Sequence, residues 1–178
     1  GPLRTYRQIR KESPGTKNHI VMGPWTHGGW SRGDGNRVGN VDFGQKTGEY
    51  YRDKIELAFF LEHLKTGSSS NLPSATMFET GTNRWRSFDA WPPADTKPQK
   101  FYLRADSALG PEPPSDADAY DQYLSDPNRP VPYVGHVQMG MQGDYMTEDQ
   151  RFAARRPDVL VYATSVLEED LTVLGPIG

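Results

Sequence analysis

The chain has 178 residues, with 20 Lys and Arg against 23 Asp and Glu and a formal net charge of −3 at pH 7. The basic residues are scattered, so no basic face of the kind that binds nucleic acid is present. No apolar run approaches the ~20 residues that a membrane-spanning helix needs, and the absence of cysteine excludes thiolate metal sites, a cysteine nucleophile and disulfides from this stretch.

The first part of the chain mixes helical and strand patterns. Leu3, Tyr6 and Ile9 have the spacing of a short amphipathic helix. Residues 19–22 form an apolar run between turn signals, which predicts a buried strand of a parallel sheet. Residues 26–44 are dense in glycine and predict a long irregular loop, and such loops in compact domains are often functional.

A longer helix is predicted over residues 49–64. Its apolar positions recur at helical spacing, and its charged residues, Arg52 and Glu62 among them, are expected to face away from the core. The Ser-rich stretch 68–71 that follows is typical of a linker. We therefore place a domain boundary there, with one domain over residues 1–70 and another over residues 71–178.

The second part has the texture of an all-β domain with long polar connections. Short strands separated in this way are typical of a β-sandwich or jelly roll. Too few strands are predicted to close a sandwich, so we expect the chain to be an internal fragment of a longer protein. The strand candidates are residues 75–80, 85–88, 100–104, 159–163 and 171–174.

Residues 21–29 carry the pattern with the strongest chemical meaning. A strand ends, Gly23 and Pro24 turn the chain, and His27 lies in the loop that follows. In an open α/β sheet, functional groups gather beyond the carboxyl ends of the strands, and a histidine there can act as a general base. From spacing alone, a purely structural loop histidine stays the commoner alternative.

Ordered blocks along nearly the whole chain resemble a known family. Residues 1–6 and 18–30 are similar to the X-Pro dipeptidyl-peptidase and cocaine-esterase group of α/β-hydrolases, which includes α-amino-acid ester hydrolases and glutaryl-cephalosporin acylase-like proteins. Further similar blocks follow in the family's order, at residues 42–44, 50–52, 55–56, 59–67, 81–86, 91–93, 101–103, 123–132, 149–152 and 156–160.

The resemblance implies a fold and a reaction. Residues 1–70 would be the C-terminal portion of an α/β hydrolase, followed by the start of an all-β jelly-roll (galactose-binding-like) domain over residues 71–178. His27 would be the catalytic histidine of a serine triad. Because the triad of this fold runs serine, acid, histidine along the chain, the other two members would precede Gly1. The chain holds no G-x-S-x-G motif, so we expect it to be inactive in isolation.

The same resemblance implies the ligands. The substrates would be small-molecule esters or amides, or short peptides, cleaved through an acyl-serine intermediate. Trp30 is a candidate substrate-binding residue, while Trp25 is expected to pack under the loop. No cofactor, metal, nucleic-acid or membrane-spanning role is expected, a homo-oligomer of the parent protein stays open, and a periplasmic or secreted location is favoured over a cytoplasmic one.

Two alternatives remain beside the hydrolase interpretation. The chain could be a non-catalytic β-rich module that binds a carbohydrate or another ligand, with Trp85 and Trp91 stacking on sugar rings. It could also be a degenerate scaffold homologue that has lost its triad. The remaining histidines do not form a metal-binding pattern; we expect His19 at a solvated strand edge and His63 in helix packing.

Overall fold

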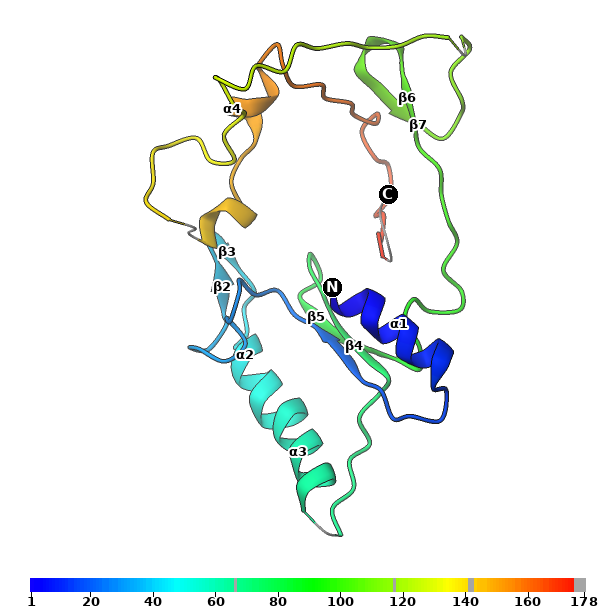
Figure 1. The fold of residues 1–178 in the computed structure, drawn as a ribbon, viewed down its shortest axis with the longest axis vertical. Coiled ribbons are helices and arrows are strands. Elements are labelled where there is room, and N and C mark those ends of the chain that lie inside the picture. Colours follow the sequence, from blue (N-terminus) through cyan, green and yellow to red (C-terminus); the bar gives the residue numbers. More distant parts are fainter. Residues whose placement is uncertain (66, 117, 141–142, 175–178) are drawn as a thin grey trace. The chain divides into compact units, whose positions relative to one another are not determined.

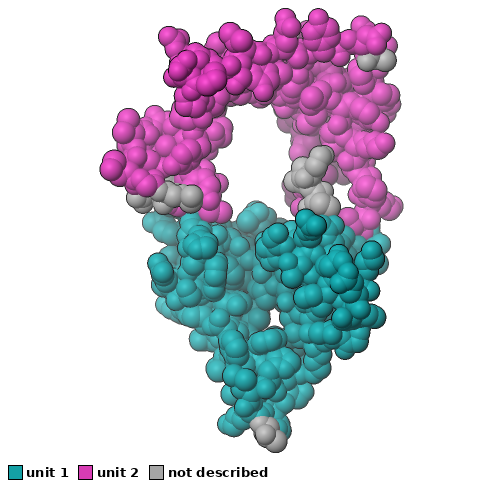
Figure 2. All heavy atoms as spheres, in the orientation of Figure 1, with its two compact units in different colours: residues 1–95 teal, residues 96–178 magenta. Residues whose placement is uncertain are grey.

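A computed structural model describes residues 1–65, 67–116, 118–140 and 143–174 (Figure 1). The chain divides into two compact units, Gly1–Asp95 and Thr96–Gly178 (Figure 2). In the part of the chain that is described, no helix is both long enough and apolar enough to span a bilayer.

The first unit is built on a three-stranded sheet in the order β1-β4-β5. β1 (Ile20–Met22) lies parallel to β4 (Ala75–Glu79), and β5 (Arg84–Phe88) returns antiparallel to β4. The expected parallel strand at residues 19–22 is therefore confirmed. The β4–β5 hairpin turns through Asn83, whose φ of 53° lies in the left-handed region that asparagine tolerates better than most residues.

One long helical segment lies between β1 and β4 in chain order (Figure 1). It consists of α2 (Thr47–Tyr50), the π-helical η1 (Tyr51–Glu56) and α3 (Leu57–Leu64), which confirms the helix predicted over residues 49–64. A short hairpin of β2 (Arg37–Val38) and β3 (Val41–Asp42) precedes it. The remainder of the glycine-rich segment is irregular, as its composition indicates.

The core of this unit lies between the sheet and α1 (Pro2–Glu12), which packs on β1. Tyr6 of the helix is buried with Ile20 and Met77 of the strands, and Ala75 beside them is fully buried. The helical spacing of Leu3 and Tyr6 thus places both on the core-facing side. Burial of these side chains supplies the main favourable term for folding of the unit.

Glu62 is largely covered, although helical spacing places it opposite the apolar positions of this helix. Its side chain is only 9% exposed and forms an ion pair with Lys17. It also accepts hydrogen bonds from the hydroxyl of Ser70 and from the Ser70 backbone N–H, at 3.3 Å. These partners, Lys17 foremost, lower the pKa of Glu62 to about 2. The linker returns along the helix, so a residue on its outer face acquires partners that helical periodicity does not reveal.

The described residues of the second unit form one regular hairpin. β6 (Tyr102–Arg104) and β7 (Ala108–Gly110) pair antiparallel around the turn η2 (Ala105–Ser107). The strands expected at residues 159–163 and 171–174 are wrong in this structure, because only Ala163 pairs, in a single parallel bridge with Ala108. A strand needs a hydrogen-bonded neighbour along its length, and Leu171 and Val173 are exposed without one.

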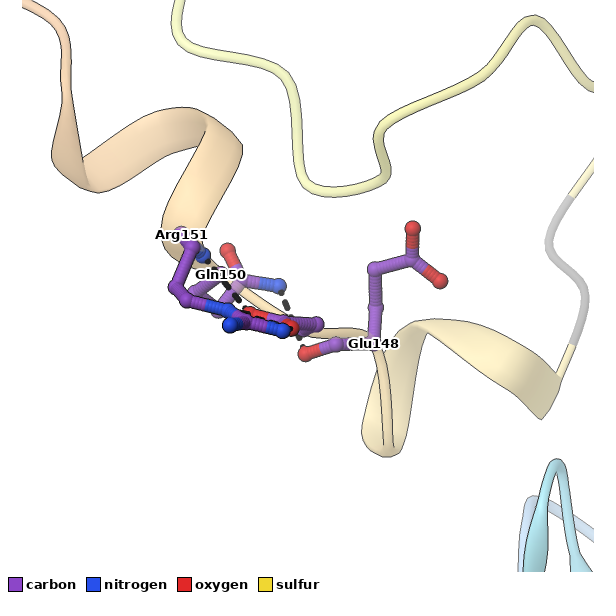
Figure 3. Close-up of polar contacts among 4 residues, drawn as sticks. Glu148, Gln150 and Arg151 are labelled. Atoms are coloured by element: carbon purple, nitrogen blue, oxygen red, sulfur yellow. Dashed lines mark hydrogen bonds and ion pairs between the residues drawn. The ribbon is translucent and has the colours of Figure 1, made fainter.

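The long polar excursion of the second unit is held by local contacts. It contains η3 (Gly143–Met146) and α4 (Arg151–Ala154). The Gln150 side chain donates to the backbone carbonyl of Glu148 at 3.3 Å, and Arg151 Nε donates to Asp149 Oδ2 at 2.6 Å (Figure 3). Glu148 in turn accepts the N–H of Gly135 at 3.1 Å. Exposed polar pairs of this kind order a loop but add little stability.

The domain boundary expected near residue 70 stays a prediction. The compact units divide after Asp95, because β4 pairs with β1 and β5 pairs with β4, so both strands remain with the first part of the chain.

Methionines 77 and 22 offer a matched test of the core, because they are register partners on neighbouring strands. Met77 is 6% exposed and Met22 is 37% exposed. We expect Met77→Ala to lower the free energy of unfolding by about 2–5 kcal/mol through lost burial and a residual cavity. Met22→Ala should cost clearly less. Urea denaturation measures both, and equal losses would contradict this assignment of the core.

Glu62 predicts a pH dependence. Its pKa lies below the ordinary value of 4.5 in the folded state, so its contribution to stability is fully present above pH 4.5 and is lost as the pH falls towards 2. Thermal melting should therefore show a Tm deficit of Glu62→Gln at pH 7 that shrinks between pH 4.5 and pH 2. Asp53→Asn, at an exposed position of the same helix, is the control. A deficit that does not change with pH would refute the role of Glu62.

Candidate functional site

The candidate site is the loop that follows β1. His27 is exposed, a few residues beyond the carboxyl end of this parallel strand. Its imidazole meets the ring of Trp30 edge to face, with centroids 6.2 Å apart and planes at 81°. The structure thus brings together the two residues proposed from the sequence, His27 and Trp30. Among the residues that are described, no carboxylate or hydroxyl hydrogen-bonds to the His27 ring.

Trp25 packs under this loop, as expected, and a buried hydroxyl holds it there. Its indole Nε1 donates to Thr47 Oγ1 at 2.8 Å, and that hydroxyl donates onward to the carbonyl oxygen of Gly35 at 2.5 Å. Thr47 is the first residue of α2 and is fully buried. A buried hydroxyl without partners is costly, and here both Trp25 and Gly35 bond to it. The Thr47 hydroxyl thereby ties these two residues of the loop to the start of the helix.

Close packing at Gly35 explains why this position is a glycine. Its φ of +69° lies in the left-handed region, and a Cβ there would lie 2.5 Å from the backbone nitrogen of Gly48. The same nitrogen donates to the carbonyl of Asp34 at 2.9 Å. The loop therefore satisfies one of the free N–H groups in the first turn of the helix, which a side chain at residue 35 would prevent.

Arg52 is a second anchor of the loop. It lies in the π-helical segment η1, and it reaches back with Nη1 to the carbonyl of Trp30 and with Nη2 to the carbonyl of Gly33, both at 2.9 Å. Arg52 lies outside the core, as expected, but it is bound to the loop and not left free in solvent. Because a π-turn contains an extra residue, it shifts the side-chain positions that a regular 3.6-residue period predicts.

Aromatic rings surround Trp25 and Trp85. Trp25 contacts Tyr51 at 5.3 Å and Trp85 at 5.8 Å between centroids, and Tyr50 stacks on Trp85 at 5.2 Å. Burial raises the pKa of Tyr51, with a further contribution from Glu56. Trp85 is thus part of a packed cluster, and its buried Nε1 has no partner among the described residues.

His19 and His63, the other histidines of the first unit, lie outside this loop. His19 is half-buried, with Nδ1 2.9 Å from the carbonyl of Pro73 and its ring 6.1 Å from that of Phe59. The expected solvated strand edge is therefore wrong for His19, because Pro73 and Phe59 of α3 contact it. His63 contacts Phe59 on its own helix, as expected, with centroids 4.4 Å apart. Within the described ranges, no three His, Asp or Glu side chains converge as a metal site.

Solved structures with the same fold define the class of this chain. It superposes on an aminopeptidase from a marine sediment archaeon, Thaumarchaeota archaeon, with a TM-score of 0.84 and 34% identity over 94% of this chain and 28% of that one. An α-amino acid ester hydrolase gives a TM-score of 0.81 and 32% identity, again over 94% of this chain and 29% of the other. These structural relatives are hydrolases.

Sequence comparison defines the family. Residues 67–178 match the model of the X-Pro dipeptidyl-peptidase C-terminal non-catalytic domain. The cocaine esterase of Rhodococcus sp. (strain MB1 Bresler) is 29% identical over 186 residues, covering 99% of this chain and 32% of that protein. The chain belongs to the X-Pro dipeptidyl-peptidase and cocaine-esterase-like family, as its sequence blocks indicate. It spans about a third of the length of this curated relative.

The candidate site lies before the matched domain. The matched domain is β-rich, in keeping with β4 to β7, and it is described as non-catalytic. His27, Thr47 and Arg52 all precede its first residue. Sequence reasoning identified His27 through the Gly-Pro turn and the family block, whereas no periodicity marked Thr47 or Arg52 as loop anchors.

Thr47→Val tests the relay under the loop. The substitution keeps the shape and removes the hydroxyl, which leaves Trp25 Nε1 and the Gly35 carbonyl without their partner. We expect a loss of about 1–3 kcal/mol in the free energy of unfolding and a change in tryptophan fluorescence before unfolding begins. Thr80→Val, at an exposed position, should change neither. A Thr47→Val protein that matches wild type in both measurements would rule out the relay.

Proposed function

We propose that the chain is the part of a serine hydrolase that supplies the triad histidine, His27, and begins the domain that follows. Residues 1–70 would complete an α/β-hydrolase domain, and residues 71–178 would start a jelly roll. The observation that carries the proposal is the placement of His27: an exposed imidazole just beyond the carboxyl end of a parallel strand, where α/β folds gather functional groups, in a chain whose relatives are esterases and peptidases.

In the proposed reaction His27 acts twice. It accepts the proton of the serine hydroxyl as that oxygen attacks the ester or amide carbonyl, and then gives the proton to the leaving alcohol or amine. Water hydrolyses the acyl-serine by the same proton transfers in the second half. The serine, the acid that orients the imidazole and the oxyanion hole would come from sequence before Gly1, because the triad order of this fold puts histidine last.

The exposed side of α3 supports a larger parent protein. Leu57, Phe60, Leu61 and Leu64 recur at helical spacing, and each is at least 40% exposed. Soluble monomers rarely leave such an apolar stripe open to water. A further polypeptide covering this stripe is what the proposal requires, since the hydrolase relatives are more than three times as long as the aligned region.

The substrate class follows from the relatives and remains part of the proposal. The proposed substrates are esters and amides of small acyl groups, including X-Pro peptides, amino-acid esters and β-lactam side-chain amides. Trp30, which is 37% exposed and in edge contact with His27, would line the acyl pocket. Its broad apolar face suits the acyl portion of such substrates rather than a charged group.

A non-catalytic role is the second candidate, and the family match of residues 67–178 to a non-catalytic domain is the observation that favours it. In that case the parent would keep the fold as a scaffold or a binding module. His27 would then be a loop residue without a serine to deprotonate, and its replacement would leave any activity of the parent unchanged.

Hydrolysis of an activated ester distinguishes the catalytic role from the non-catalytic one. In the parent protein, including the segment that the proposal places before Gly1, His27→Ala should lower kcat by a factor on the order of 10⁴ or more, as loss of a triad member does. His63→Ala, another exposed histidine, is the matched control and should keep wild-type rates. The 178-residue chain alone should show no hydrolysis.

Two results would contradict the proposal. One is a parent protein in which His27→Ala keeps full activity, which would favour the scaffold or binding role. The other is hydrolysis by the 178-residue chain at a rate that His27→Ala abolishes, because such a chain would have to contain its own nucleophile.

A further inference from the structure

We propose that Arg52 is a positioning residue for His27, a role that rests on the proposed function of that histidine. The observation is the double contact of one guanidinium with the loop. Nη1 binds the carbonyl of Trp30 and Nη2 binds the carbonyl of Gly33, each at 2.9 Å. Through these two bonds a helix that follows the loop in sequence sets the backbone path just beyond His27.

The chemistry of the contact requires an arginine. A guanidinium presents its N–H groups in a rigid planar fork, so two acceptors separated along a loop can be held by one side chain. Hydrogen bonds from a charged donor are about twice as strong as neutral ones. In the described part of the chain no ion pair involves Arg52, so its charge is directed at the two carbonyl oxygens.

The anchor lies close to the imidazole. The Trp30 carbonyl that Arg52 holds belongs to the residue whose indole meets the His27 ring edge to face, with centroids 6.2 Å apart. On the other side of His27, Trp25 is held by the Thr47 hydroxyl at 2.8 Å. The segment between them is a turn closed by the Gly29 N–H on the Thr26 carbonyl at 2.9 Å. His27 thus sits on a short turn that is anchored at both ends.

The placement of Arg52 depends on the π-helical segment. Arg52 is the second residue of η1 and is half-buried, whereas Asp53 and Lys54 after it are exposed. Single π-turns within α-helices are frequently found at functional sites. Here the turn directs one arginine towards the loop and leaves its neighbours in solvent, which also provides a matched control at Lys54.

A general base that is displaced reacts slowly even when substrate still binds. Misplacement by about 1 Å can cost on the order of 100-fold in rate. We therefore expect Arg52→Gln, in the parent protein, to lower kcat about tenfold or more with little change in KM. Arg52→Lys should give a smaller loss, because an ammonium can hold one carbonyl but not both in the fork geometry. Lys54→Gln should match wild type.

The NMR resonances of the His27 ring provide a readout that a general loss of stability would not change. The ¹H and ¹³C resonances of the His27 ring carry a ring-current shift from Trp30, and they are followed by NMR in the same parent variants at a temperature where each is folded. Arg52→Gln should move the His27 resonances towards those of a free histidine, while His19 and His63 keep theirs. If Arg52→Gln does not fold, Arg52→Lys carries both measurements.

The outcomes distinguish this inference from the proposed function. Loss of kcat together with the His27 shift supports the positioning role. Unchanged kcat and unchanged His27 resonances in both Arg52 variants overturn it, and a drop in Tm without either effect assigns Arg52 to stability alone. If His27→Ala itself keeps full activity, the proposed function fails first; the His27 shift in Arg52→Gln then still reports whether Arg52 orders the loop.

Discussion

Parallel pairing of β1 with β4 is the constraint on which the rest of the first unit depends. Parallel strands cannot be joined by a tight turn, so the chain must cross back over a longer path, usually through a helix. The crossover here contains the glycine-rich loop and the long helical segment of α2, η1 and α3. The loop that carries His27 therefore begins at one parallel strand, and the helix that anchors it leads towards the next.

That arrangement links two regions that family comparison separates. The match to the non-catalytic domain begins at residue 67, yet β4, which lies inside it, forms ladder pairs with β1, the strand that leads to His27. The fully buried Ala75 of β4 faces Ile20 in that ladder. Residues assigned to a domain without catalytic groups thus help to build the sheet on which the candidate catalytic loop depends.

How much was predictable follows from the range of each interaction. Local spacing was enough for α1, through Leu3 and Tyr6, and for the long helix, while the Gly-Pro turn and the family block located His27. The contacts of Arg52 and Glu62 could not be read from helical spacing, because their partners Trp30 and Lys17 lie 22 and 45 residues away in sequence. The strands expected at residues 159–163 and 171–174 did not form for a related reason. An apolar run forms a strand only where another segment pairs with it, and within these two runs only Ala163 is paired.

The π-turn of η1 makes the length of this helix as important as its composition. Each residue of an α-helix advances by about 100° around the axis, so deleting a single residue from Tyr51–Glu56 would rotate the start of the segment against its end. Thr47 and Arg52 could no longer both reach the loop while α3 kept its packing. Insertions and deletions in η1 are therefore more tightly constrained than substitutions. Homologues should keep the number of residues in η1 even where its side chains differ.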